Sequence, residues 1–440
     1  MRHFMMNEYA DEYKAKLTSC DSAAAAIKDG DTVMHGVTVA EPPGMLGAIA
    51  ARARAGDLNR IKVYTFNAQK HFAQTLGNPD IADVIDSYSW FVSQDSRNMV
   101  RVGLTQFVPA YLHQIPKIVA ETMEVDVTVT TVSRMNDDGY FSFGPCNGYL
   151  SVVAKLSKKL IVEVNENMPF VYGDALIHIS DISMIVENTV PLMEILPLPP
   201  NPLDPVIGKI VAEYVPDGAV LQLGIGTLPN AIAPYLEGHK DLGIHTELLC
   251  PGMVDLIEKG VITGRQKNLH PGKHIFSLAY GSKKTFDFMN ENRSFENYPS
   301  SYVMNPGVIA QNHTMTSVNA ILQIDLLGQC NAEFLEGHQY SGTGGQLDFV
   351  RGAYDSPGGK AILVLYSTAK NGDISRIVSR FPEGTMVTTP RMDVHYIATE
   401  YGIVNLKGKS TRERALALIS IAHPKFQNEL MREAENMALM

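Results

Sequence analysis

One order of local features occurs twice in the chain and constrains its fold more than any other pattern. Residues 29–36 read as an Asp-Gly turn, an apolar strand and a glycine, and residues 217–224 repeat this order. A proline follows each copy, Pro43 or Pro229, and opens an Ala-, Ile- and Leu-rich segment of helical character. The repetition predicts two domains with a common fold.

The correspondence continues downstream. A second strand candidate follows each predicted helix, at residues 61–64 or 243–246, and a lysine precedes a later strand at 160–164 or 361–365. Strands joined by helices in this way form parallel α/β sheets. The fold class expected is therefore α/β, with two similar domains and largely parallel sheets. The alternative is that two unrelated α/β segments use similar glycine turns by chance.

The division between the domains is expected at a proline-rich segment. Residues 197–205 contain too many prolines for a helix or a central strand, so they are predicted to form a stiff linker. An N-terminal domain would then span residues 1–196 and a C-terminal domain residues 206–440. A chain of 440 residues also exceeds the usual size of a single hydrophobic core.

Composition excludes several classes of protein. The formal net charge of -10, with no basic tract, argues against binding to a nucleic-acid backbone. The four cysteines are far apart and show no metal-ligand spacing, which favours the cytoplasm and predicts no metal site. Residues 1–20 contain acidic side chains and no unbroken apolar core, so neither a signal peptide nor a membrane anchor is expected.

Glu247 is the strongest candidate for a catalytic residue. It lies in the predicted strand that follows the glycine loop at residues 224–228, and alternation along that strand places His245 and Glu247 on one face. A parallel neighbour would bring this face beside the loop. Free backbone N–H groups at the end of the preceding strand would suit an oxyanion or a phosphate. The pattern indicates a carboxylate used as a nucleophile.

Other motifs in the chain are less specific. The loop lacks the third glycine of a dinucleotide fingerprint, because Pro229 stands there. Ser367 and Lys370 fit an S-x-x-K pattern, but the accompanying elements of acyl-serine enzymes are missing. His245 and Glu247 alone are too few for a metal site. Pro234 is expected to kink or shorten the helix after the loop.

Together these segments resemble the acetyl-CoA hydrolase/transferase family of CoA-transferases, and most closely its 4-hydroxybutyrate CoA-transferase branch. The resemblance is carried by residues 139–144, 224–231, 243–247, 318–329 and 341–349, and so covers nearly the whole chain. It implies two CoA-transferase-type domains that are similar to sugar-phosphate isomerase-like folds. It also implies that Glu247 forms a glutamyl-CoA thioester.

The same resemblance implies roles for the glycine-rich loops. An oxyanion-binding loop would approach the CoA thioester, formed by Gly224, Ile225, Gly226, Thr227 and Leu228. Contacts to CoA are implied for Gly344, Gly345 and Lys370. Coenzyme A would be a substrate and transient adduct, with no tightly bound cofactor. The implied assembly is a homodimer or homotetramer.

The activity expected is transfer of CoA between a short-chain acyl-CoA and a carboxylic acid, with acetyl-CoA and 4-hydroxybutyrate favoured. Such an exchange passes through anhydrides, so an enzyme carboxylate can hold the acyl group and then CoA in turn. Two alternatives stay open at this point. Water could replace the acceptor, which would make the chain an acyl-CoA hydrolase, or the fold could serve a non-catalytic ligand sensor.

Overall fold

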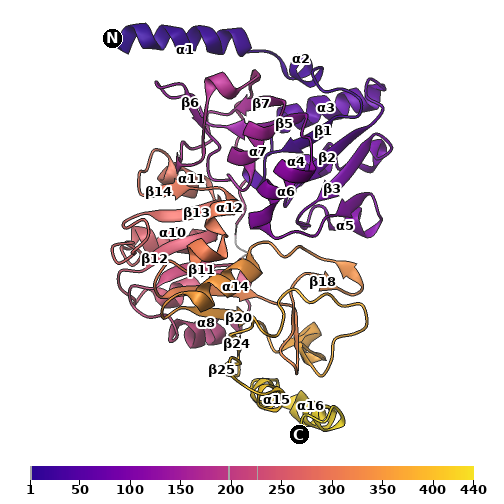
Figure 1. The fold of residues 1–440 in the computed structure, drawn as a ribbon, viewed down its shortest axis with the longest axis vertical. Coiled ribbons are helices and arrows are strands. Elements are labelled where there is room, and N and C mark those ends of the chain that lie inside the picture. Colours follow the sequence, from indigo (N-terminus) through magenta and orange to yellow (C-terminus); the bar gives the residue numbers. More distant parts are fainter. Residues whose placement is uncertain (1, 197–198, 225) are drawn as a thin grey trace. The chain divides into compact units, whose positions relative to one another are not determined.

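The computed structural model describes residues 2–196, 199–224 and 226–440, and this part of the chain forms two compact units (Figure 1). Unit 1 contains residues 1–195, 276–302 and 339–342, and unit 2 contains residues 196–275, 303–338 and 343–440. The chain therefore returns twice to unit 1 after first entering unit 2. Residues 197 and 198 of the expected linker lie outside the described residues, and the predicted boundaries stay a prediction.

Unit 1 is built on a 7-stranded sheet in which every neighbouring pair is parallel. In spatial order its strands are β10 (Met184–Glu187), β7 (Lys159–Val164), β5 (Val127–Val132), β1 (Thr32–His35), β2 (Ile61–Thr65), β3 (Ile85–Ser89) and β4 (Thr105–Phe107). Its helices include α1 (Arg2–Lys16), α2 (Cys20–Ala24), α3 (Pro43–Ala55), α4 (Lys70–Gln74), α5 (Arg97–Arg101), α6 (Ile115–Thr122), α7 (Leu150–Leu156) and α11 (Lys283–Met289).

The sheet of unit 2 repeats this arrangement. In spatial order, its strands include β25 (Gly402–Asn405), β24 (Tyr396–Thr399), β20 (Lys360–Val364), β15 (Met315–Ala320), β11 (Val220–Leu223) and β12 (Gly243–Leu249). Only β25 runs antiparallel to its neighbour among these pairs. The helices of the unit include α8 (Asp204–Ala212), α9 (Thr227–Ile232), α10 (Pro251–Glu258), α13 (Pro306–Ile309), α14 (Gln346–Asp355), α15 (Thr411–Ser420) and α16 (Pro424–Asn436).

Comparison of the two strand orders confirms the predicted duplication. The order β10-β7-β5-β1-β2 in unit 1 corresponds to β24-β20-β15-β11-β12 in unit 2. The paired strands are those that the sequence repeat aligns, so β1 matches β11 and β2 matches β12. The shared order is a property of the whole sheet, which chance use of similar glycine turns would not produce.

Burial of the strands on both faces explains their apolar sequences. All six residues of β5 and all seven residues of β12 are buried, as expected for parallel strands covered by helices on either side. The core of unit 1 gathers side chains of α3, β1 and β2, among them Ile49, Val33 and Val63. A glutamate in β12 therefore sits in an interior position and not on the surface.

The returning segment 276–302 contributes directly to unit 1. Its strand β14 (Phe295–Asn297) pairs in parallel with β8 (Tyr172–Gly173), and the Asn297 side-chain amide donates to the carbonyl of Gly144 over 3.0 Å. The side chain of Phe295 is fully buried. Strand β13 (His274–Ala279) spans the change from unit 2 to unit 1.

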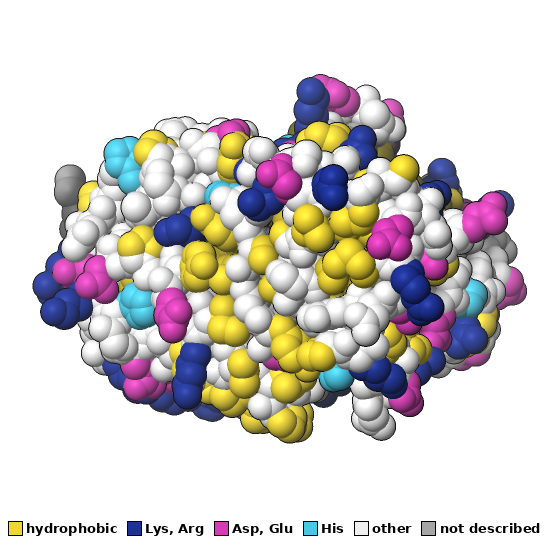
Figure 2. Space-filling view, turned by 90° about the horizontal axis from the view of Figure 1, so that it is seen from below, with side chains coloured by type: hydrophobic (Ala, Val, Ile, Leu, Met, Phe, Trp, Pro, Cys, Tyr) yellow, Lys and Arg dark blue, Asp and Glu magenta, His cyan; other side chains and the backbone are white. Residues whose placement is uncertain are grey.

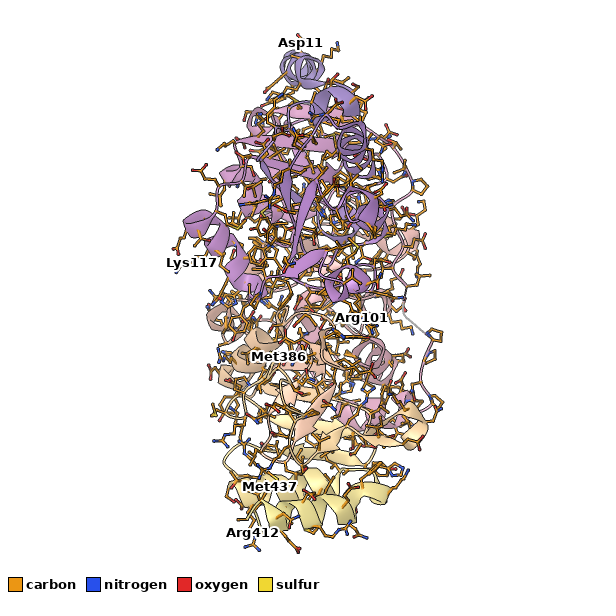
Figure 3. The ribbon with its side chains drawn as sticks, turned by 90° about the vertical axis from the view of Figure 1, so that its right-hand side faces the viewer. Asp11, Arg101, Lys117, Met386, Arg412 and Met437 are labelled. Atoms are coloured by element: carbon orange, nitrogen blue, oxygen red, sulfur yellow. The ribbon has the colours of Figure 1, made fainter. Side chains whose placement is uncertain are left out.

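At the C-terminal end of the chain, α15 and α16 pack against each other within unit 2 (Figure 1, Figure 3). A capping box begins α15, where the Ser410 and Glu413 side chains satisfy each other's backbone N–H groups.

The face drawn in Figure 2 mixes hydrophobic, acidic and basic side chains and shows no continuous basic tract. No helix among the described residues is long and apolar enough to cross a membrane.

Candidate active site

The position of Glu247 follows from the register of two neighbouring strands. Strand β12 pairs in parallel with β11, and Leu221 stands opposite Ile244. Counting three residues onward along each strand brings Gly224 and Glu247 to the same level, at the carboxyl end of the sheet. Ligand sites of parallel α/β sheets form at this edge. The predicted parallel neighbour of the glutamate strand is thus present.

The Glu247 carboxylate contacts the glycine-rich segment that precedes α14. Its Oε2 atom accepts a hydrogen bond from the backbone N–H of Gly345 over 2.8 Å. Gly345 is the N-cap of α14, so the carboxylate also lies at the positive end of that helix. A Cβ atom on Gly345 would come within 2.5 Å of Oε2, and only glycine leaves room for this contact.

Burial governs the protonation of Glu247. The residue is 7% exposed, and this loss of hydration raises the pKa of its carboxyl group to about 7. The Gly345 N–H lowers the pKa, whereas the nearby charge of Asp348 on α14 raises it. The side chain therefore titrates close to neutral pH, as expected of an acid-base or nucleophilic group in an active site.

His245 shares a face of β12 with Glu247, as alternation predicts, but takes part in packing. Its Nε2 atom lies 2.8 Å from the carbonyl oxygen of Val303, and its ring packs edge-on against Phe349 of α14. Full burial lowers its pKa to about 3, so the ring is neutral. No group of three or more His, Cys, Asp or Glu within the described ranges could hold a metal ion.

The glycine loop after β11 is only partly available as a donor. The N–H of Gly224 extends the β11–β15 ladder by donating to Val318 over 2.8 Å, so it is not one of the free N–H groups expected there. Ile225 lies outside the described residues. Gly226 is exposed and adopts a φ of 129°, which favours glycine, and Thr227 begins α9. Leu228 is buried, at 4% exposure.

A buried amide pair supports this loop, and sequence patterns gave no sign of it. The side chains of Gln222 on β11 and Asn319 on β15 exchange two hydrogen bonds, of 2.9 and 3.0 Å. A Cβ atom on Gly224 would stand 2.4 Å from the Asn319 Oδ1 atom. Glycine is therefore needed at this position because the backbone approaches the amide pair closely.

The helix after the loop ends where proline predicts. Helix α9 stops at Ile232, and a 3₁₀ turn from Ala233 to Leu236 follows with Pro234 in its first positions. Proline cannot supply the N–H that a continued α-helix would need. The predicted shortening of this helix is confirmed.

Lys370 lies apart from these contacts. It begins a 3₁₀ turn after β21 (Thr368–Ala369), with a φ of 49°. Its ammonium group is 3.4 Å from the Glu336 carboxylate, and the two side chains are 67% and 71% exposed. Ser367 does not pair with it, because the Ser367 hydroxyl donates to Glu400 over 2.5 Å. This bond removes the basis for an S-x-x-K nucleophile.

Comparison with known proteins assigns the family. The model of the acetyl-CoA hydrolase/transferase N-terminal domain matches residues 1–197, and that of the C-terminal domain matches residues 281–434. The chain belongs to the acetyl-CoA hydrolase/transferase family. The two matched ranges include Gly344, Gly345 and Lys370, whereas Glu247 and the loop at 224–228 lie between them.

Full-length relatives of this family cover the interval between the two ranges. The chain is 42% identical to the succinyl-CoA:cyclohexane-1-carboxylate CoA transferase of Geobacter metallireducens, over 98% of this chain and 97% of the relative. It is 39% identical to the 4-hydroxybutyrate coenzyme A transferase of Clostridium kluyveri, over 97% and 99%. The crystal structure of RipA from Yersinia pestis, at 44% identity, matches with a TM-score of 0.95 and covers 98% of this chain and 100% of that chain.

Proposed function

We propose that this acetyl-CoA hydrolase/transferase family member is a CoA-transferase that uses Glu247 as its nucleophile. The observation that carries the proposal is the Glu247 carboxylate, buried at the carboxyl end of a parallel sheet and bound by the Gly345 N–H over 2.8 Å. CoA-transferase relatives along the full length of the chain support the reaction class. The favoured substrates are acetyl-CoA and 4-hydroxybutyrate.

The chemistry uses the two carboxylate oxygens of Glu247 differently. Since Gly345 binds Oε2, the Oε1 atom attacks the carbonyl carbon of the acyl-CoA, the C–S bond breaks, and CoA leaves as a thiolate. The product is an anhydride between the acyl group and Glu247. The thiolate then attacks the Glu247 carbonyl carbon, the donor acid leaves as a carboxylate, and CoA remains as a glutamyl thioester.

The acceptor acid completes the cycle by the reverse sequence. Its carboxylate attacks the glutamyl thioester, CoA leaves again, and the returning thiolate takes the acyl group from the second anhydride. No proton is gained or lost over the cycle. Each step develops negative charge on a carbonyl oxygen, and the Gly345 N–H beside Oε2 is suited to stabilise that charge on the glutamyl group. The loop from Gly224 to Leu228 would serve the acyl oxygen through donors other than the Gly224 N–H, which is bonded to Val318.

Trapping the covalent intermediate tests this proposal. After incubation with acetyl-CoA, intact-mass measurement should show a gain equal to CoA less one water, and peptide mapping should place it on Glu247. Glu247→Ala should show no adduct and lose CoA transfer by at least about a thousandfold, because the nucleophile is gone. An active Glu247→Ala variant, or no adduct on an active enzyme, would contradict the proposal. A wild-type chain that shows neither an adduct nor CoA transfer would favour a ligand sensor.

The acceptor is tested separately. Consumption of acetyl-CoA should depend on added carboxylic acid and should yield the CoA thioester of that acid, with 4-hydroxybutyrate giving the largest kcat/KM among short-chain acids. Consumption at the same rate without any acid, with release of free CoA, would show that water is the acceptor and that the chain is a hydrolase. The cytoplasmic location, the homodimeric or homotetrameric assembly, and the contacts of Gly344 and Lys370 to CoA stay predictions.

A further inference from the structure

Two side-chain contacts anchor the segment that presents Gly345 to Glu247. On one side of Gly345, the Thr343 hydroxyl donates to the Glu333 Oε1 atom over 3.2 Å. On the other side, the Gln346 side-chain amide donates to the Thr389 hydroxyl over 3.0 Å. The backbone N–H of Gln346 also closes a turn on the Thr343 carbonyl. The donor to the nucleophile therefore sits between two tethered residues.

Both anchors belong to one connected support within unit 2. An isolated antiparallel bridge before Glu333 joins Cys330 to Thr389 by backbone bonds of 3.0 and 3.1 Å. The Asn331 side chain accepts from the Glu333 N–H over 3.1 Å. Glu333 itself is 8% exposed. These bonds fix the Glu333 backbone relative to Thr389. The Glu333 carboxylate therefore offers Thr343 an acceptor at a defined position.

We propose that Glu333 is a positioning residue for the CoA-transfer reaction, acting through Thr343 to hold the Gly345 N–H against the Glu247 carboxylate. The inference rests on the proposed function, because it assigns a purpose to the placement of a nucleophile. Glycines at 344 and 345 make the segment pliable, with Gly344 at a φ of 56°. The hydrogen bond from Thr343 to Glu333, called the tether below, holds in place a segment that the glycines leave flexible. A donor that is to be preorganised needs such support.

Removal of the tether should impair chemistry more than binding. Glu333→Leu and Thr343→Val each remove the hydroxyl–carboxylate bond, and each should lower kcat by about tenfold while the KM for acyl-CoA changes by less than about twofold. Glu333→Gln keeps an acceptor oxygen of the same shape, and Thr343→Ser keeps the hydroxyl. These two conservative variants should retain at least about half of the wild-type kcat.

The pH profile supplies a readout that a purely structural role would not move. Since only the Glu247 carboxylate attacks, kcat falls as pH drops through its pKa, and the Gly345 N–H lowers that pKa. Glu333→Leu and Thr343→Val should therefore shift the acid limb of kcat to higher pH. Asp348 on α14, whose charge raises the Glu247 pKa, and His245 on the same face of β12 are unchanged in both variants. Thr343→Val removes no ionisable group, so a shift in that variant does not come from a lost charge.

A matched control uses a hydroxyl–carboxylate pair elsewhere in unit 2. Ser410 donates to Glu413 over 2.7 Å at the start of α15, so Ser410→Ala removes a similar bond and should leave kcat and the acid limb unaltered. Circular dichroism of every variant checks folding. If Glu333→Leu fails to fold, the comparison of Thr343→Val with Thr343→Ser decides the question alone.

The possible outcomes separate this inference from the proposed function. Wild-type kcat and pH profile in folded Thr343→Val would overturn the positioning role, even when Glu247→Ala is inactive. An equal loss in Glu333→Gln and Glu333→Leu would also overturn it, because the amide keeps the acceptor. Full activity in Glu247→Ala would instead remove the proposed function itself.

Discussion

At the scale of single residues, the Glu247 carboxylate is buried and accepts a hydrogen bond from the Gly345 N–H. Burial disfavours its charged form, while the Gly345 N–H and the positive end of α14 favour it. The balance leaves the carboxyl group with a pKa of about 7. Under the proposed function, the chain then has a nucleophile at neutral pH that is less solvated, and so more reactive, than a surface carboxylate.

This balance predicts how stability depends on pH. The pKa of Glu247 is raised from 4.5 in its reference state to about 7 in the fold. Ionisation of Glu247 therefore lowers the free energy of unfolding progressively between pH 4.5 and 7; the cost is complete above pH 7 and absent below pH 4.5. Glu247→Gln should therefore be more stable than wild type at pH 8, by up to about 3 kcal/mol, and equally stable at pH 4. Denaturant unfolding at both pH values measures the difference.

Glu413, an exposed glutamate, serves as a control because its pKa shift has the opposite sign to that of Glu247. Ser410 lowers the pKa of Glu413, so its contribution to stability is present above the unfolded pKa and is lost as pH falls. Glu413→Gln should be less stable than wild type at pH 8 and similar to it at pH 2. A stability gap for Glu247→Gln that stays constant from pH 4 to pH 8 would show that burial does not control its titration.

Gly345 should tolerate no side chain. Gly345→Ala would place Cβ 2.5 Å from Glu247 Oε2 and 3.0 Å from the Met304 side chain, which displaces the proposed nucleophile. We expect kcat for CoA transfer to fall by at least about a hundredfold. Gly47→Ala is the control, since nothing lies within 4 Å of its Cβ position in α3, and it should keep full activity with a slightly raised Tm. Normal turnover by Gly345→Ala would contradict the proposed geometry.

At the scale of elements, the ends of β11 and β15 are tied by the buried amide pair of Gln222 and Asn319. The strands carry the glycine loop on one side and continue to β20 on the other. Because the pair is only 1% and 6% exposed, water cannot replace a missing partner. The carboxyl edge of the sheet is thus held by side chains as well as by the backbone ladder.

Removing one amide of this pair should lower the free energy of unfolding more than removing both amides. Gln222→Leu leaves the Asn319 amide buried without its acceptor and donor, which should lower the free energy of unfolding by about 1–3 kcal/mol. Asn319→Leu should behave alike, and the double variant should regain part of the loss. A double-mutant cycle from urea unfolding gives the coupling energy. Strictly additive losses would mean that the two amides do not stabilise each other.

At the scale of the whole molecule, the two units share a fold but are not consecutive in the chain. Segment 276–302 completes unit 1 although strands β11 and β12 of unit 2 precede it in the chain. Asn290 accepts from the Phe170 N–H, and the carbonyl of Ser277 accepts from the Asn147 N–H. A division of the chain between residues 196 and 206 would therefore remove part of unit 1.

A fragment of residues 1–196 tests this dependence. The only tryptophan of the chain, Trp90, is buried in unit 1 at 2% exposure and reports on its folding. In the fragment, the surface that Phe295 and Met289 cover would be exposed, so we expect red-shifted Trp90 emission and a urea midpoint well below that of the full chain. Emission and a midpoint equal to those of the full chain would show that residues 1–196 fold independently of 276–302.

Local patterns in the sequence determined the duplicated α/β fold and the candidate nucleophile. Turn residues, apolar strands and proline-started helices depend on neighbours along the chain, so the match of β1 to β11, the parallel β11–β12 pair and the end of α9 could all be predicted. Glu247 stood out because an acidic residue in an apolar strand is unusual. The resemblance of the motifs then gave the family.

Tertiary structure alone decided which distant groups meet. Gly345 binds Glu247 from 98 residues away in the chain, Gln222 pairs with Asn319, and Glu333 receives Thr343, and no local periodicity encodes these pairings. It also showed that the Gly224 N–H belongs to a strand ladder and that Lys370 is a surface residue facing Glu336. The physical reason is that hydrogen-bond partners of buried polar groups are chosen by packing in three dimensions, whereas strands and turns are chosen by local chain chemistry.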